Sequence, residues 1–271
     1  MSLKVSDIIK IIEEFAPPKF KENYDNVGLM VGDSNSRVIK ILVALDCTLE
    51  VIDEAIRNNC NLILTHHPLL FKAPQSITME TVIGRKIIKL ISHDISVYSA
   101  HTNLDSVCGG LNDIVMEMLG INNYSTMDKS LNRSQDDNIT GIGRIADLES
   151  DITLSGLCAL VKDVFDIEYL SYSGEDTMIV KKVAVINGSG KDYFQKAKEL
   201  GANCIITGDT SYHYVNDMLE ENIAVIDAGH FNSEWNAFKR VGKMIDTCLQ
   251  NRGYKNTVML SNVCSNPYKI K

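Results

Sequence analysis

The 271-residue chain lacks the features that mark several large classes of protein. It has no run of Lys or Arg longer than two and a formal net charge of −8, so it offers no obvious surface for the phosphate backbone of a nucleic acid. No stretch approaches the roughly 20 apolar residues that a membrane span needs. Its first residues lack the apolar core and cleavage site of a signal peptide. We therefore expect a cytoplasmic protein without nucleic acid or membrane partners.

The seven cysteines show no pattern, because they are scattered, odd in number and contain no C-x-x-C pair. This argues against a disulfide framework and against a structural zinc knuckle. We expect most of them to be small core residues in a reducing compartment.

Hydrophobic residues make up 45% of the chain and charged residues 23%, an ordinary globular composition that allows a substantial core. Short apolar runs alternate with helical patterns, which predicts βαβ units and mostly parallel sheets, an α/β fold. The predicted strands are 26–32, 41–45, 62–65, 95–99, 183–186, 204–207, 224–226 and 257–260. The predicted helices are 5–15, 48–58, 81–92, 111–119, 154–165, 191–200, 212–220 and 233–249.

The two halves of the chain resemble each other. Asn61-Leu-Ile-Leu-Thr65 is echoed by Asn203-Cys-Ile-Ile-Thr207, which indicates an internal duplication; convergence of short strand patterns is the alternative. We expect two related α/β domains, 1–127 and 128–271, with the metal site described below in the cleft between them. The polar segment 122–138 is expected to be a surface connection, and the C-terminal segment is a candidate to pack back on the first half.

Several histidines follow predicted strands, where ligand sites of parallel sheets form. His66 and His67 directly follow the strand 62–65, and Pro68 favours an extended conformation at His67. Neighbouring side chains on an extended backbone point in opposite directions, so the pair can face two ions or wrap one. An exposed loop is the alternative for such a pair.

Further donors follow other strands. His101 and Asp105 follow the strand 95–99, and Asp105 can bridge two cations or simply cap a helix. His230 and Glu234, four residues apart at a helix start, can chelate one ion from one face; an ordinary helix start is the alternative.

Together His66, His67, Asp105, His230 and Glu234 supply three imidazoles and two carboxylates. This set is too large for one tetrahedral ion with an open position, and it predicts two divalent ions with a bridging carboxylate. Zinc, iron and manganese suit such ligands about equally. His101 and His213 are candidate proton carriers.

Segments along the chain resemble a known family. They are Asp25–Asp33, Leu64–Lys72, Ser99–Asp113, Gly141–Ile145, Ile186–Asp192, Ile206–His213 and Asp227–Glu234. They are similar to the dinuclear-metal proteins called GTP cyclohydrolase 1 type 2 homologues, or the Nif-three-like family. The resemblance implies two α/β domains, two metal ions held by the five ligands named above, and a hexameric ring. Phe231 stands where many members have tyrosine, and the large central insert of some members is missing.

Three functions are compatible with these features. The first is a metal-dependent hydrolase that acts on a nucleotide or another small molecule, as the cyclohydrolase resemblance implies. The second is a non-catalytic metal-binding or adaptor protein, and the third a nucleotide-binding regulator without metal. The segment Asn187–Lys191 is either a phosphate cradle of backbone amides or a plain tight turn, and it lacks the P-loop spacing. Asp25 and Asn26 either line the cleft or make a turn.

Overall fold

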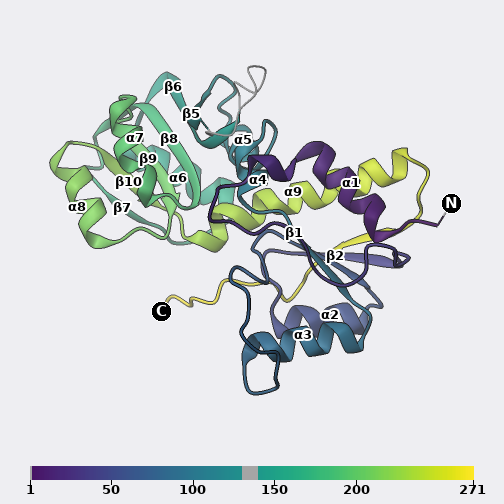
Figure 1. Ribbon diagram of the computed structural model, residues 1–271. Coiled ribbons are helices and arrows are strands. Elements are labelled where there is room, and N and C mark those ends of the chain that lie inside the picture. Colours follow the sequence, from purple (N-terminus) through teal and green to yellow (C-terminus); the bar gives the residue numbers. More distant parts are fainter. Residues whose placement is uncertain (1, 130–139) are drawn as a thin grey trace. The chain divides into compact units, whose positions relative to one another are not determined.

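The computed structural model describes residues 2–129 and 140–271, which form two compact units (Figure 1). Unit 1 comprises Met1–Leu104 and Phe238–Lys271, and unit 2 comprises Asp105–Ala237. The chain therefore passes between the units inside two helices, α4 (Thr102–Ser106) and α9 (His230–Asn251).

The division lies at 104/105 and 237/238, whereas the sequence predicted a boundary at 127/128. It falls earlier in the chain because α5 (Leu111–Met118) packs on the strands of unit 2 and β5 (Ser125–Lys129) pairs with β6 (Gly141–Thr153). The C-terminal strand β11 (Thr257–Leu260) pairs with β2 (Lys40–Ala44) of unit 1.

Unit 1 is a sheet covered on both faces by helices. Its strand order is β1-β4-β3-β2-β11, and every neighbouring pair is parallel except β1 with β4. The remaining elements of the unit are β1 (Gly28–Val31), β3 (Leu62–Thr65), β4 (Ser96–Ser99), α1 (Val5–Phe15), the 3-10 turn Pro18–Phe20, α2 (Leu49–Arg57) and α3 (Val82–Ser92).

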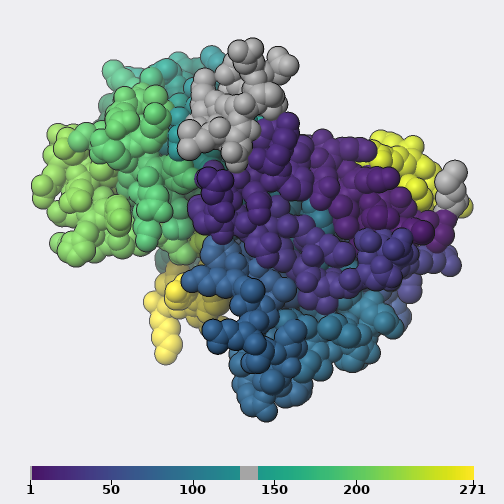
Figure 2. Space-filling model, in the orientation of Figure 1, coloured from purple at the N-terminus to yellow at the C-terminus, as the bar shows by residue number. Residues whose placement is uncertain are grey.

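Both faces of this sheet are apolar, which explains why its central strands are continuous hydrophobic runs. Leu42 and Ile63 face α2 and α3, which lie side by side in Figure 1. Val43 contacts the α9 helix at Gly242, and α1 covers the same face with Ile11 and Ile12. The N-terminal segment with α1, purple in Figure 2, forms much of the visible surface of this unit.

Unit 2 has a mixed sheet in the order β5-β6-β8-β9-β10-β7. Its central strands β8, β9 and β10 are parallel, while β5, β6 and β7 pair antiparallel. The 3-10 turn Lys191–Tyr193 and the helices α7 and α8 cover one face of the sheet, and α5 and α6 pack on β6 and β8. The elements not yet named are α6 (Leu154–Phe165), β7 (Ser171–Ser173), β8 (Ile179–Ser189), a 3-10 turn (Lys191–Tyr193), α7 (Phe194–Glu199), β9 (Cys204–Gly208), α8 (Tyr212–Glu220) and β10 (Ala224–Asp227).

The two units share one topology. The order β1-β4-β3-β2 in unit 1 matches β7-β10-β9-β8 in unit 2, with the first strand antiparallel in each. The two repeated asparagines make equivalent hydrogen bonds. The Asn61 carboxamide accepts from the Ile39 amide and donates to the Arg37 carbonyl. The Asn203 carboxamide accepts from the Lys181 and Lys182 amides and donates to the Ile179 carbonyl. The fold class predicted from the sequence, two related α/β domains, is therefore confirmed.

Each predicted helix and strand has a counterpart, whereas β5, β6 and β7 were not predicted. The segment 122–138 was expected to be a connection, but β5 occupies part of it, and 130–138 lie outside the described residues. In 2–129 and 140–271, no helix has the length and apolar character to cross a membrane.

Candidate metal centre

The adjacent histidines His66 and His67 occupy the turn that follows β3, and the backbone there is tightly held. The His67 amide donates to the Leu45 carbonyl at 3.0 Å. Thr65 Oγ1 donates to the His67 carbonyl at 2.9 Å and lies 2.8 Å from Ser99 Oγ. His66 is fully buried, and the His67 side chain is 22% exposed. The exposed-loop alternative for this pair is therefore wrong.

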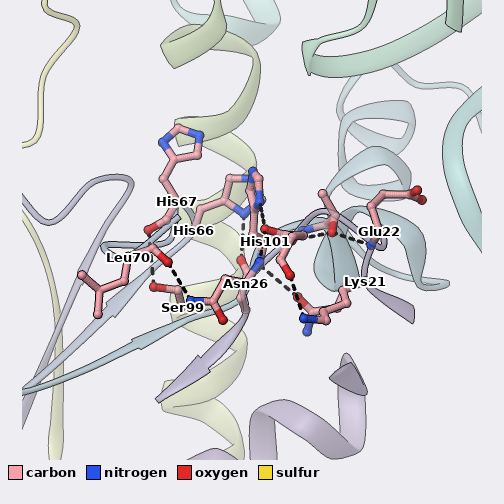
Figure 3. Close-up of polar contacts among 12 residues, drawn as sticks. Lys21, Glu22, Asn26, His66, His67, Leu70, Ser99 and His101 are labelled. Atoms are coloured by element: carbon pink, nitrogen blue, oxygen red, sulfur yellow. Dashed lines mark hydrogen bonds and ion pairs between the residues drawn. The ribbon is translucent and has the colours of Figure 1, made fainter. Parts of the chain in front are cut away.

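His101 follows β4 and joins the pair, so three imidazoles of unit 1 form one cluster (Figure 3). Ring centroids are 5.2 Å apart for His66 and His67, 5.0 Å for His66 and His101, and 5.7 Å for His67 and His101. One ring nitrogen from each lies within 4.8 Å of the others. The parallel register of β3 and β4 explains this, because it brings the carboxyl ends of both strands together.

The Nδ1 atom of each clustered histidine lies against an oxygen. His66 Nδ1 is 2.9 Å from the Ala100 carbonyl, His67 Nδ1 is 2.8 Å from Asp46 Oδ1, and His101 Nδ1 is 2.8 Å from Asp25 Oδ1.

Carbonyl and carboxylate oxygens only accept hydrogen bonds, so each Nδ1 carries the hydrogen and Nε2 carries the lone pair in the neutral ring. Histidines that ligate metals are oriented by such partners. The cluster therefore holds its imidazoles in the tautomer in which Nε2 is the nitrogen that can bind a metal.

Asp25 is the most firmly held of these acceptors. Its Oδ2 accepts from the Thr102 amide at 3.0 Å and from Thr102 Oγ1 at 2.5 Å, while Oδ1 also accepts from the Asn26 amide at 2.8 Å. Burial raises the Asp25 pKa, but the hydrogen bonds and charge of His101 and the hydrogen bonds of Thr102 outweigh it, so the pKa falls to about 2. Asp25 thus stays anionic and orients His101, while Asn26 Nδ2 ties this turn to the Leu70 carbonyl at 2.6 Å.

His230 and Glu234 lie together on the first turn of α9 in unit 2. His230 Nε2 is 3.2 Å from Glu234 Oε2, so the two side chains lie on one face of the helix, as the i, i+4 spacing predicted. His230 Nδ1 lies 2.8 Å from Asp209 Oδ2, so this imidazole has the same orientation as the three in unit 1.

The backbone of β8 supports this pair at Gly188. A Cβ at that position would lie 2.2 Å from Glu234 Oε1 and 3.3 Å from His230 Nε2, and φ is +60°. The Gly188 amide also donates to Ser233 Oγ at 3.1 Å. Only glycine allows the chain to pass this close to the carboxylate.

Asp105 lies half-buried on α4, and the segment after it is anchored in unit 2. Its carbonyl accepts from Asn112 Nδ2 at 3.1 Å. The buried pair of Arg144 with Asp113, together with the Arg144 bond to the Val107 carbonyl at 3.1 Å, ties this segment to β6. Asp105 is therefore more than a polar loop residue on a free surface.

His213 belongs to neither group of possible metal ligands. It is exposed near the start of α8, and its ring lies against that of Tyr212, with 5.4 Å between the ring centroids. Its role as a proton carrier remains a prediction. Sequence reasoning missed Asp46 and Asp209. Asp46 directly follows the predicted strand 41–45 and Asp209 lies two residues after the predicted strand 204–207, and those positions were the available signal.

The segment Asn187–Lys191 is not an open cradle of backbone amides. The Asn187 amide donates to Asn112 Oδ1, the Gly188 amide to Ser233 Oγ and the Gly190 amide to Thr207 Oγ1, each at 3.1 Å. The phosphate cradle considered from the sequence is therefore wrong for these three amides, because side chains of the protein already occupy them.

Comparisons with known proteins agree with the fold. Residues 3–267 match the family model described as Duf34/NIF3 (NGG1p interacting factor 3). Proteins named GTP cyclohydrolase 1 type 2 homolog are similar: that of Clostridium acetobutylicum is 52% identical over all of both chains, and that of Clostridium perfringens is 51% identical over 90% of this chain and 91% of its own. The Staphylococcus aureus hypothetical protein SA1388 superposes with a TM-score of 0.90 at 28% identity, covering all of both chains.

Proposed function

The chain belongs to the Duf34/NIF3 (NGG1p interacting factor 3) family, and on that premise we propose that it binds two divalent metal ions and uses them to hydrolyse a small molecule such as a nucleotide. His66, His67, Asp105, His230 and Glu234 are the proposed ligands. The observation that carries the proposal is the shared orientation of four histidines. In His66, His67, His101 and His230, Nδ1 lies against an oxygen acceptor, which makes Nε2 the ring nitrogen that can bind a metal.

The chemistry of the donor set fits two ions. Imidazole and carboxylate together suit zinc, iron or manganese. The strands and helices already hold the donors, and Gly188 leaves room for the Glu234 carboxylate. A set preorganised in this way binds a metal without first ordering its ligands.

Chain connectivity supports the proposal that ligands of both units act together. The chain passes between the units after Leu104 and after Ala237. Asp105 is the first residue after one of these points, and Glu234 precedes the other by three residues. Two of the five proposed ligands, Asp105 and Glu234, thus lie beside the points where the chain passes from one unit to the other.

Two bound ions would supply a water molecule of lowered pKa as the nucleophile and would polarise the bond that is cleaved. His101 would accept a proton at Nε2, since Asp25 holds its Nδ1–H and favours the imidazolium that results. His213 is the second candidate for proton transfer. Phe231, on α9 next to His230, can contribute packing but no hydroxyl group.

The test combines metal analysis with a substrate screen. We expect protein purified without added salts to contain close to two ions per chain by mass spectrometry, and His67→Ala and Glu234→Ala to lose most of that metal and turnover. His93→Ala is the matched control, because His93 Nδ1 also bonds a carbonyl, that of Lys89 at 2.9 Å, on the exposed end of α3.

The outcomes separate the competing functions. Unchanged turnover of a confirmed substrate in folded His67→Ala would remove the hydrolytic mechanism. Metal-loaded protein that is inert towards nucleotides, phosphoesters and amides would favour the non-catalytic metal-binding or adaptor function.

We also propose that the protein is cytoplasmic and forms a homohexameric ring. All seven cysteines are free, as a reducing compartment requires, and the family resemblance supports the ring. Light scattering on the purified protein tests the assembly, and a monomeric mass would contradict it.

A further inference from the structure

Asn187, near the end of β8, lies between the segments of unit 2 that carry proposed ligands. Its backbone amide donates to Asn112 Oδ1 at 3.1 Å, and Asn112 Nδ2 donates to the Asp105 carbonyl at 3.1 Å. On its other side, Gly188 is the residue whose backbone approaches Glu234 and His230. Asn187 is therefore the neighbour in sequence of the glycine that lies against Glu234 and His230, and two hydrogen bonds through Asn112 connect its backbone to that of Asp105.

Asn187 is half-buried, and the nitrogen of its side chain is unusual. Its Nδ2 is inaccessible to solvent and has no hydrogen-bond partner in 2–129 and 140–271. Other buried asparagines of the protein are bonded: Asn103 Nδ2 donates to the Ala16 carbonyl at 2.7 Å, and its Oδ1 accepts from the His101 amide at 2.9 Å. Because an unsatisfied buried donor destabilises a fold, such a group calls for a functional explanation.

We propose that the Asn187 carboxamide donates a hydrogen bond to the molecule that binds at the metal centre, an inference that rests on the proposed function. The acceptor would be an anionic oxygen, such as that of a phosphate or carboxylate group. The amide N–H only donates, so its partner must be an acceptor. Three backbone amides of this segment are already engaged by Asn112, Ser233 and Thr207, whereas the buried Asn187 Nδ2 has no partner among the described residues.

The test uses zinc-loaded protein with inorganic phosphate as the probe. Asn187→Ala removes the donor, and we expect the phosphate Kd measured by calorimetry to rise about tenfold, the effect of one hydrogen bond to a charged partner. Zinc content should stay at the wild-type value. The melting temperature without phosphate should not fall, because Asn187 Nδ2 donates no hydrogen bond to any of the described residues.

Asn203→Ala is the matched control. This asparagine lies in the same unit and is fully bonded, with Oδ1 accepting from the Lys181 and Lys182 amides at 3.1 Å and Nδ2 donating to the Ile179 carbonyl at 2.9 Å. Its loss should lower the melting temperature by several degrees while leaving the phosphate Kd unchanged. A structural asparagine and a ligand-binding one thus give opposite results.

Two results would overturn the inference. The first is an Asn187→Ala protein that binds phosphate like the wild type. The second is an Asn187→Ala protein that loses stability as Asn203→Ala does, because a buried water or a structural hydrogen bond would then satisfy the Asn187 side chain. Wild-type protein that holds zinc but ignores phosphate would also overturn it. Failure of the proposed metal binding is distinguishable, since in that case the wild type holds no zinc. Failure of the proposed hydrolysis alone would leave the zinc content and the phosphate Kd of the wild type unchanged.

Discussion

Replacing Asp25 by asparagine should reveal how much the anionic carboxylate stabilises the end of β4. The pKa of Asp25 falls from 3.8 to about 2 because the hydrogen bonds and charge of His101 and the hydrogen bonds of Thr102 outweigh the effect of burial, which raises it. At about 1.4 kcal/mol per pKa unit, this lowering corresponds to about 2.5 kcal/mol of folding free energy. The carboxamide of the variant would also present its NH2 group either to the His101 donor or to the Thr102 donors, so we expect Asp25→Asn to lose about 2–3 kcal/mol at pH 7.

The sign of the pH dependence follows from the lowered pKa. The contribution of Asp25 is fully present above the unfolded value of 3.8 and disappears as the pH falls through that value towards about 2. The difference in unfolding free energy between wild type and Asp25→Asn should therefore be constant from pH 7 to about pH 5 and shrink below pH 4.

Urea denaturation of metal-free protein, with a chelator present, measures this difference without a contribution from metal binding. Asp33→Asn is the control, because Asp33 is exposed in the same unit and its Oδ1 accepts from the nearby Asn35 amide at 2.8 Å. A loss in Asp25→Asn that is as large at pH 3.5 as at pH 7 would refute the electrostatic reasoning, and so would no loss at pH 7.

Three further predictions concern other parts of the structure. Gly188→Ala should weaken zinc binding at least tenfold in a competition assay with a chelating dye, because the new methyl group would displace the Glu234 carboxylate; wild-type affinity would contradict the close approach described above. Asp209→Ala should cost about 10–100-fold in zinc affinity in the same assay, since it frees the imidazole that it orients, and an unaltered affinity would show that this contact is dispensable. Arg144→Met should lower the free energy of unfolding, measured in urea, by about 3–5 kcal/mol, because it leaves the Asp113 carboxylate buried without its cation. The double variant with Asp113→Asn should recover part of this loss. A single variant as stable as the wild type would argue against the buried pair.

The sequence predicted the local structure well where periodicity is strong. The spacing of Val5, Ile8, Ile11 and Ile12 fixes one buried face of α1, and the helix begins and ends at the predicted residues. It failed at β5, β6 and β7, which are only partly apolar and depend on antiparallel partners far along the chain. Strand formation there is decided by pairing, which a local pattern does not contain.

The candidate site divides in the same way. The His66-His67 pair, His101 and the i, i+4 spacing of His230 and Glu234 are visible as donors that follow strands or begin a helix, because parallel strands place their carboxyl ends together. The carboxylates Asp25, Asp46 and Asp209 were not visible as their partners. Each lies 21 or 76 residues away from the histidine that it holds.

The amino-acid sequence by itself determined the α/β class, the duplicated order of strands and helices, and the residue types available as metal ligands, because these depend on local periodicity and side-chain chemistry. Only the tertiary structure decided which nitrogen of each imidazole is committed, which amides near Gly188 are engaged and which donor of Asn187 is left over. Those properties depend on hydrogen bonds between residues distant in the chain, and such bonds exist only once the strands have taken their register.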